Sequence, residues 1–341
     1  MKIVIKMKRK KSELLGILIL VLLQVSATQF NSEVEVDGAT NQNNIQLIQQ
    51  EEFNPSDAEI FINSDDDFLS YAFPGNGTIN DPFRIENYTF DTIKLFGILI
   101  VNTTKHVVVQ NNSIAASNTA LKVEFNDPGT LSFKNNTCKN SEIGLCTKFT
   151  AGIVIRYNDF WGNNESLLVI NTRDVLIENN TVRNNNLGIV LKTTNATFPT
   201  VNCSVMFNLL ENNTGYGVTI PAFYENRWTK ENSIHHNTFA NNNPDGKKQA
   251  LDDGIGNEWD DGENTGNYWS DWWGIGSYNI RGLAKSKDNY PLNDPIHVVT
   301  TKIPGIFKGR ILIFVVFTPI LLGGYIFVQT RKRRSKTIEE E

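Results

Sequence analysis

At 341 residues, the chain is long enough for one extended domain with membrane elements at its ends. Its formal net charge is −5, but the part between two basic ends contains 21 basic and 33 acidic residues, a net of −12. An acidic surface of this kind repels nucleic acid and anionic lipid, so we expect no nucleic-acid partner.

The N-terminal residues predict export. Six basic residues precede an apolar run from Leu14 to Val25, which is followed by a small-x-small site at Val25-Ser26-Ala27. This order is typical of a signal peptide, which we predict over residues 1–27, with an uncleaved signal anchor as the alternative. Residues 28–59 are rich in Asn, Gln and Glu, which indicates a flexible lead-in.

Residues 60–96 are predicted to form an N-terminal cap. Turn-forming residues at Gly75-Asn76-Gly77-Thr78 and Asp81-Pro82 separate short apolar runs. The open end of a stack of strands needs a cap of this kind because unpaired strand edges invite association.

Residues 97–250 repeat one short pattern. Each copy can be aligned on one asparagine, and the copies are 22 to 29 residues apart: Asn112, Asn136, Asn158, Asn180, Asn208 and Asn237. Apolar residues alternate on both sides of these asparagines, which indicates short strands with one buried face, not helices. A period of this length predicts a stacked solenoid. We therefore expect an all-β, right-handed parallel β-helix of about 6–8 rungs, with caps at both ends.

The register predicts what the repeated residues do. The position two residues after the asparagine is apolar in every copy and should form one inward row: Ile114, Cys138, Phe160, Val182, Leu210 and Phe239. The asparagines themselves should occupy corners, adopt the left-handed conformation and hydrogen-bond from coil to coil as a ladder. Cys138 and Cys203 fall on inward positions, whereas Cys146 is predicted to point outward.

Residues 251–294 are rich in Asp, Gly and Trp and should form the C-terminal cap. Four aromatic residues are candidates for stacking on sugar rings, or for closing the open end of the core: Tyr268, Trp269, Trp272 and Trp273. Five carboxylates could supply oxygen ligands to calcium, although Asp-Gly pairs are also ordinary turn formers: Asp252, Asp253, Asp260, Asp261 and Glu263.

The C-terminal residues predict a membrane anchor. Residues 295–310 contain Pro295 and Pro304 and are expected to form a stalk, and residues 311–328 carry no charge. Eighteen such residues span roughly 27 Å as a helix, enough to cross a hydrocarbon core. The basic residues that follow should keep the tail, residues 329–341, in the cytoplasm. The expected location is the cell membrane, with one span and an extracellular N-terminal domain.

The outward positions of the repeat show no clustered carboxylates of the kind that a lyase or hydrolase needs. They do contain apolar residues, which favour either a protein partner or coverage by a neighbouring segment: Val154, Leu168, Leu176 and Val190. Two adjacent histidines, His235 and His236, are the weak signal for a copper site.

Ten Asn-x-Ser/Thr sequences are candidates for glycosylation, which export would make feasible. Several are created by the corner repeat itself. They are Asn76, Asn87, Asn102, Asn111, Asn135, Asn164, Asn179, Asn195, Asn202 and Asn212.

Three stretches resemble one known family: GNGTINDPFRIEN near the start, ENNTVRNNNLGIVL in the repeats, and NEWDDGENTGNYWSDWW with DNYPL near the end. They are similar to the β-helix family of the copper-protein maturation factor NosD and to its archaeal surface relatives. The resemblance implies the β-helix type shared by carbohydrate-binding proteins and sugar hydrolases (CASH), often on exported proteins.

Three functions follow as hypotheses. The first is a cell-surface, membrane-anchored β-helix protein that binds carbohydrate or envelope components without catalysis. The second is a tethered polysaccharide lyase or hydrolase. The third is a NosD-like maturation factor for a copper enzyme. Calcium is the only cofactor that we consider for the first.

Overall fold

The computed structural model describes residues 51–223, 228–246 and 248–296. The predicted signal peptide, most of the lead-in, nearly all of the stalk, the membrane span and the tail lie outside these residues. Among the residues that are described, no helix is long and apolar enough to cross a membrane. By its internal contacts the chain divides into Met1–Glu52 and Phe53–Glu341, and every helix and strand described belongs to the second unit.

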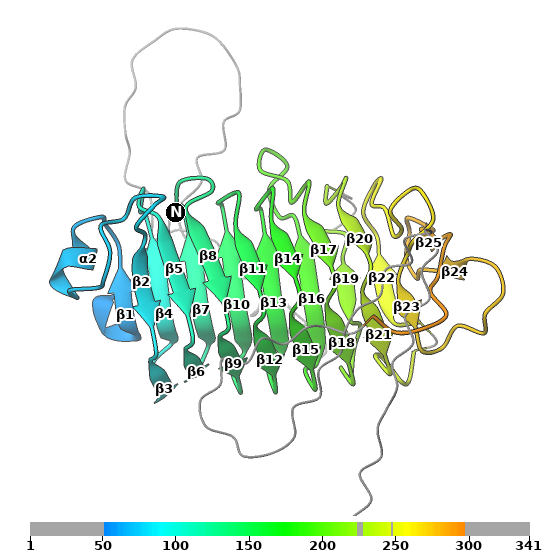
Figure 1. Ribbon diagram of the computed structural model, residues 1–341, viewed down its shortest axis with the longest axis horizontal. Coiled ribbons are helices and arrows are strands. Elements are labelled where there is room, and N and C mark those ends of the chain that lie inside the picture. Colours follow the sequence, from blue (N-terminus) through cyan, green and yellow to red (C-terminus); the bar gives the residue numbers. More distant parts are fainter. Residues whose placement is uncertain (1–50, 224–227, 247, 297–341) are drawn as a thin grey trace, which may run out of the picture. The chain divides into compact units, whose positions relative to one another are not determined.

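Three sheets of parallel strands run along the second unit (Figure 1). Sheet A contains, in order, β1 (Ala58–Ile62), β4 (Phe96–Val101), β7 (Thr119–Glu124), β10 (Ile143–Lys148), β13 (Glu165–Ile170), β16 (Leu187–Lys192), β19 (Val218–Ile220) and β22 (Ala250–Asp252). Sheet B contains β2 (Phe83–Glu86), β5 (Val107–Gln110), β8 (Leu131–Lys134), β11 (Val154–Arg156), β14 (Leu176–Glu178), β17 (Ser204–Met206) and β20 (Ser233–His235). Sheet C contains β3 (Thr89–Thr92), β6 (Ser113–Ala116), β9 (Thr137–Lys139), β12 (Asp159–Trp161), β15 (Thr181–Arg183), β18 (Leu209–Glu211), β21 (Thr238–Ala240) and β23 (Tyr268–Trp269).

Four short elements lie outside these sheets. They are the 3-10 helix η1 (Pro55–Asp57), the helix α2 (Asp67–Ser70), and the antiparallel pair β24 (Tyr278–Asn279) and β25 (Lys287–Asp288). Each coil of the chain passes through sheets B, C and A in turn, so residues 22 or more positions apart pair in register. The predicted all-β parallel β-helix is therefore confirmed.

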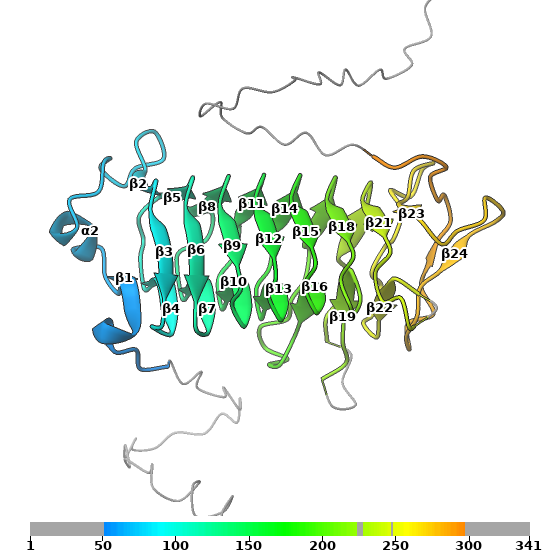
Figure 2. The same cartoon turned by 90° about the horizontal axis from the view of Figure 1, so that it is seen from below.

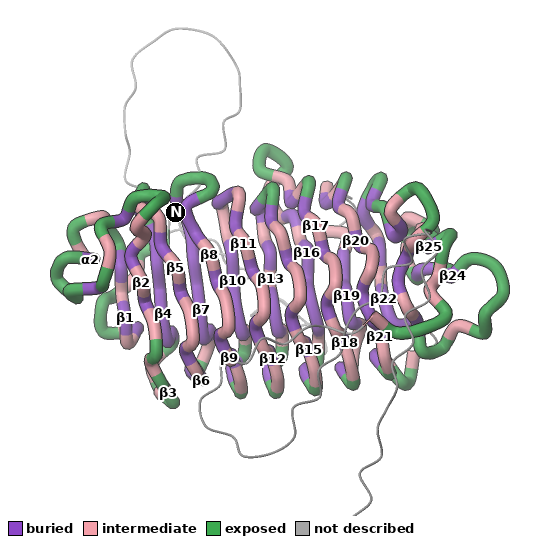
Figure 3. Tube along the Cα trace, viewed as in Figure 1, coloured by how far each residue is buried: buried purple, intermediate pink, exposed green. Residues whose placement is uncertain are grey.

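The inward row predicted from the repeat is present. Ile114, Cys138, Phe160, Val182, Leu210 and Phe239 pair in succession along sheet C, and each is fully buried. Sheets A and B add their own buried rows, so one apolar core fills the inside of the coils. The tube of Figure 3 shows this alternation as buried and half-buried segments along many of the strands.

A ladder of asparagine side chains lines the corner between sheets B and C. From Asn112 to Asn237, the backbone N–H and the side-chain amide of each ladder asparagine donate to Oδ1 of the asparagine one coil further on, at 2.9–3.1 Å. The same amide groups also donate to backbone carbonyls, as Asn158 does to Phe133 O and Arg156 O. The predicted ladder is confirmed.

The left-handed corner residue is not the ladder asparagine, and that prediction was wrong. Positive φ values occur one residue earlier, at Asn111, Asn135, Tyr157, Asn179, Phe207 and His236. The preceding residue makes the turn, because the ladder side chain must point inward to meet its equivalents. Aromatic residues at three of these positions show that the stack imposes the conformation even where asparagine is absent.

Sequence reasoning missed two further ladders. At the corner between sheets C and A, Asn163, Asn185, Asn213, Asn242 and Gln249 repeat the same bonding. Near the C-terminal end of the A-to-B corner, Asn232 donates to Asn257 in the same direction. In all three ladders the donors point toward the C-terminal end.

The predicted boundaries of the caps need correction. β1, β2 and β3 belong to the three sheets, so the coils begin before residue 97, and β1 begins inside the predicted lead-in. The N-terminal cap proper is the segment around α2, where Phe68 is buried and stacks on Phe83 at 4.6 Å. Likewise, β22 and β23 place strands of the predicted C-terminal cap in sheets A and C (Figure 2).

Candidate functional site

The aromatic residues of the C-terminal cap mainly close the core. Trp269 is 1% exposed and stacks between Phe239 and Tyr278, with both ring centroids at 4.1 Å. Trp259, which is also buried, packs beside it. Bulky rings thus replace the missing next coil, and Trp269 has no face available to a sugar.

The structure does not bring the four predicted aromatic residues to one surface. Tyr268 and Trp272 are half-buried, and Trp272 packs against the core. Trp273 is 93% exposed. A sugar platform made of all four residues is therefore not formed.

The carboxylates of this cap end the amide ladders. Asp288 Oδ2 accepts hydrogen bonds from Asn267 N at 2.7 Å and from Trp269 Nε1 at 2.8 Å. Asn267 is itself the acceptor for Asn237, the last ladder asparagine of the B-to-C corner. At its C-terminal end the ladder presents only N–H donors. A carboxylate only accepts hydrogen bonds, so Asp288 can satisfy the last of these donors.

The other two ladders end in the same way. Asp252 Oδ1 accepts from Asn257 Nδ2 at 3.0 Å, and its second oxygen accepts from Trp259 Nε1 at 3.0 Å. Asp271 Oδ1 accepts from Gln249 Nε2 at 2.6 Å. Burial raises the pKa of Asp288, an effect opposed by the donors from Asn267, Trp269 and Tyr290.

The predicted calcium ligands do not converge. Each of Asp252, Asp253, Asp260 and Asp261 accepts hydrogen bonds from nearby protein groups, and Glu263 is exposed. Within residues 51–296, apart from the five that the structure leaves undescribed, no three or more His, Cys, Asp or Glu side chains group as a metal site. The geometry assigns Asp252 and Asp260 to the architecture of the cap.

An aromatic edge that the sequence did not reveal runs beside sheet A. Phe125 and Phe149 each follow a strand of sheet A directly, both with positive φ, and their rings stack at 5.2 Å. Phe198 comes from the inserted loop after β16 and meets Phe149 edge-on at 5.8 Å. We call Phe125, Phe149, Phe198 and Phe223 the aromatic edge.

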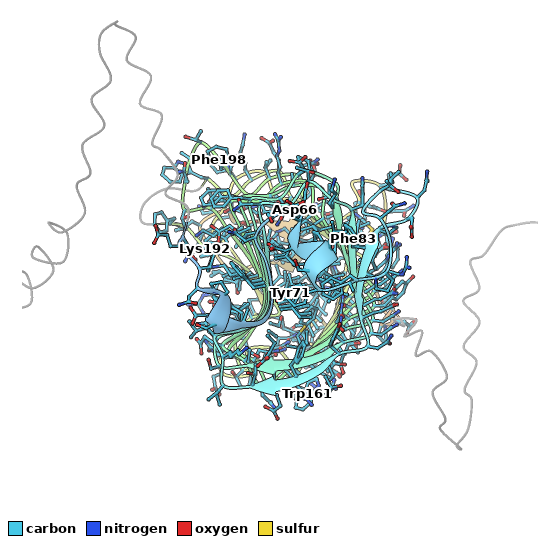
Figure 4. All side chains as sticks on the ribbon, turned by 90° about the vertical axis from the view of Figure 1, so that its left-hand side faces the viewer. Asp66, Tyr71, Phe83, Trp161, Lys192 and Phe198 are labelled. Atoms are coloured by element: carbon cyan, nitrogen blue, oxygen red, sulfur yellow. The ribbon has the colours of Figure 1, made fainter. Side chains whose placement is uncertain are left out.

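Lysines accompany these rings. Lys148 Nζ lies 5.4 Å from the centroid of Phe149, and Lys192 Nζ lies 5.9 Å from that of Phe223. Phe198 is 42% exposed, and the other three rings are half-buried. Figure 4, which looks along the coils from the N-terminal end, shows Phe198 and Lys192 on the same side.

A charged cluster adjoins the aromatic edge on the outer face of sheet A. The Glu124 side chain is fully buried, with Lys148 Nζ at 3.0 Å and Lys122 Nζ at 3.4 Å. The two ammonium groups compensate the charge of this buried carboxylate. It fixes one of the lysines that flank the rings.

Trp161 makes a useful contrast because it has similar chemistry on a different sheet. On the outer face of sheet C, Lys139 and Arg183 lie one coil before and one coil after it, both 5.7 Å from its ring centroid. Figure 4 shows Trp161 on another side of the coils from Phe198. Trp161 therefore combines a ring with nearby cations, as the aromatic edge does, but lies apart from that edge.

One carboxylate near sheet A has a perturbed pKa. Glu165, at the start of β13, is half-buried, and burial raises its pKa, while Lys192 lowers it and Glu142 raises it further. Glu142 is exposed and accepts a hydrogen bond from Asn164 at 2.6 Å. Sequence reasoning overlooked this pair because the two glutamates lie at different offsets from their asparagines.

The two adjacent histidines face each other. His235 Nδ1 and His236 Nδ1 are 2.6 Å apart, and Met206 is the register partner of His235 on the preceding strand of sheet B. Burial lowers the pKa of both imidazoles, and His236 lowers that of His235 further.

The four predicted outward apolar residues lie in two separate columns. Leu168 and Val190 pair on sheet A, whereas Val154 and Leu176 pair on sheet B. Val190 is only 3% exposed, and the other three are half-buried. The four residues therefore do not form one exposed stripe, and neighbouring coils are close enough to cover part of each side chain.

The cysteines and the sequons are placed as follows. Cys138, Cys146 and Cys203 are all buried, and they form no disulfide with one another. Cys146 occupies an outward register position as predicted, between Lys122 and Leu168 on the adjacent strands, and is nevertheless buried. None of the ten candidate glycosylation asparagines is buried, and glycosylation stays a prediction.

A shallow depression of about 480 Å³ adjoins the N-terminal cap. Its lining includes Asp67 and Tyr71. Asp67 Oδ2 accepts hydrogen bonds from Asn63 N and Ser64 N at 2.8 and 2.9 Å, so its charge is already used to hold the cap.

Comparisons with known proteins agree with this architecture. Residues 74–221 match a family described as "Right handed beta helix region". No curated protein and no solved structure matches the chain. The family match and the three stacked parallel sheets together support a right-handed parallel β-helix for this part of the chain.

Proposed function

We propose that the chain is a cell-surface protein, anchored by its predicted span at residues 311–328, whose β-helix binds carbohydrate or another envelope component without catalysis. The fold is consistent with carbohydrate-binding or polysaccharide-acting proteins. The observation that carries the proposal is the aromatic edge with its lysines.

The aromatic edge has the chemistry of a saccharide-binding surface. Ring faces and edges pack against the C–H groups of a sugar, and Lys148 and Lys192 can donate to hydroxyl or acidic groups beside them. Phe125 and Phe149 lie on successive coils, so an extended chain could contact one ring after another. The membrane, protein and calcium partners expected from the sequence stay proposals beside this one.

A glycan array probed with the purified chain tests the proposal. We expect binding of at least one extended saccharide, reduced about tenfold by Phe198→Ala, which corresponds to the loss of one stacking contact of about 1.4 kcal/mol. Trp161→Ala is the matched control and should leave binding unchanged. Absence of saccharide binding, or equal loss in both variants, would overturn the proposal.

A tethered hydrolase is the second candidate, and Glu165 is the observation that favours it. A carboxyl group with a raised pKa beside a second, exposed carboxylate is the arrangement of a general acid and its partner. Release of reducing or unsaturated sugars by the chain, abolished in Glu165→Gln, would establish catalysis and displace the binding function.

A NosD-like role in copper-enzyme maturation is the third candidate. It is supported only by the paired imidazoles of His235 and His236 beside Met206. Stoichiometric copper binding that is lost in His236→Ala would support this role, and its absence would end it.

A further inference from the structure

The loop between β23 and β24 exposes two large apolar side chains at the C-terminal end of the coils. Trp273 is 93% exposed and Ile275 is 87% exposed. Figure 3 draws most of this loop as exposed, and β23 and β24 lie at the end of the stack in Figure 2. Side chains of this size and exposure on one short loop need an explanation beyond the fold.

The loop is built to present these side chains. Gly274 and Gly276 both have positive φ, at +79° and +68°, and open space surrounds the position of an added Cβ at each. Trp272, one residue before Trp273, packs against the core and fixes the base of the loop. The tip therefore turns outward around two glycines, while the base is held.

The chain leaves the coils at the same end. The Leu292 backbone N–H donates to Asn267 O, and Ile296 exchanges hydrogen bonds with the Thr238 hydroxyl on β21. The uncharged stretch begins at residue 311, only 15 residues after Ile296. A chain of that length reaches at most about 50 Å, so a bilayer holding residues 311–328 lies within reach of this end.

We propose that the Trp273–Ile275 loop inserts into the interface of the membrane that anchors the chain. An indole ring is favoured at the boundary between headgroups and acyl chains, and Ile275 adds an aliphatic group that a saccharide platform would not use. The contact would orient the coils and the aromatic edge relative to the membrane. This inference rests on the proposed anchoring and adds to it a second point of attachment.

Site-directed spin labelling tests the insertion. The full chain is reconstituted in phosphatidylcholine vesicles with a nitroxide at Ile275→Cys, or at Ile93→Cys as the matched control, since Ile93 is 97% exposed on the loop after β3. The native cysteines are buried, and the unsubstituted chain measures any background label. We expect the label at 275 to collide more with oxygen than with a water-soluble nickel complex, and the label at 93 to show the reverse.

Flotation of the vesicles separates the two levels of the proposal. A chain that does not float with the vesicles overturns the anchoring, and this inference with it. A chain that floats while the label at 275 is as open to nickel as the label at 93 overturns the inserted loop alone. A glycan-array signal lost in Trp273→Ala, with the label at 275 in water, would assign the loop to saccharide instead.

Discussion

Replacing Asn158 by alanine should destabilise the coils far more than replacing an exposed asparagine. Asn158 is 2% exposed, and its side chain makes five hydrogen bonds. Its oxygen accepts from Asn136 N and Nδ2, and its amide donates to Phe133 O, Arg156 O and Asn180 Oδ1. Asn180 Oδ1 keeps a second donor, the Asn158 backbone N–H, in the variant.

Asn136 Nδ2 likewise keeps Val109 O, and Arg156 O keeps the Asn135 N–H, so the main loss in Asn158→Ala falls on two buried groups, Asn136 N and Phe133 O. Each unpaired buried group costs about 1–3 kcal/mol, and water entering the vacated space can satisfy part of them. We expect a net loss of about 3–5 kcal/mol in the free energy of unfolding. The isosteric Asn158→Asp should lose at least as much, because a buried carboxylate would face three acceptors.

Urea unfolding followed by circular dichroism gives the stability change, with hydrogen exchange of residues 131–183 as a local measurement. The local measurement matters because stacked repeats can open one by one. Asn186→Ala is the control, since Asn186 makes a similar coil-to-coil contact to Asn164 but is exposed. Losses below about 1 kcal/mol in both alanine variants would refute the stabilising role of the buried ladder.

Three further predictions concern the C-terminal cap. Asp288→Asn would place an amide donor opposite the N–H donors that end the ladder, and should lower the free energy of unfolding by about 2–3 kcal/mol, measured by urea unfolding. An unchanged urea midpoint would contradict the role of the carboxylate. Trp269→Ala should cost about 3–5 kcal/mol in the same assay, whereas Trp273→Ala should change stability by no more than about 0.5 kcal/mol. Burial tends to raise the pKa of Asp261, but three backbone N–H donors lower it to about 2. The stability that it contributes is therefore present above its unfolded pKa and lost as pH falls from about 4 toward 2, and Asp261→Asn should flatten that part of the pH profile of the urea midpoint.

The sequence predicts the coils well because each coil repeats the same local requirement. The row from Ile114 to Phe239 follows from a fixed offset to the asparagines, and its burial follows from alternation alone. The second ladder had a comparable signal, since Asn163, Asn185, Asn213 and Asn242 each follow a ladder asparagine by five residues. Its inward role was missed because the repeat was aligned on one column only.

The candidate site was beyond sequence reasoning for a different reason. Phe198 and Phe223 belong to insertions of irregular length, so no period places Phe198 beside Phe149 or Phe223 beside Lys192. Asp288 meets Asn267 only because the chain returns across the end of the stack. Contacts made by loops that reverse direction depend on their individual paths, which a repeating pattern does not contain.

The shared direction of the ladders has a consequence for how such a protein changes size. A coil of 22 residues, such as residues 159–180, accepts hydrogen bonds from the coil before it and donates equivalent hydrogen bonds to the coil after it. If this coil were duplicated, every ladder donor and acceptor would therefore still have a partner. Tandem copying could lengthen the rod by whole increments. The two ends of the stack cannot be exchanged or copied in this way, because only the C-terminal end carries the carboxylates that accept the last donors of the ladders.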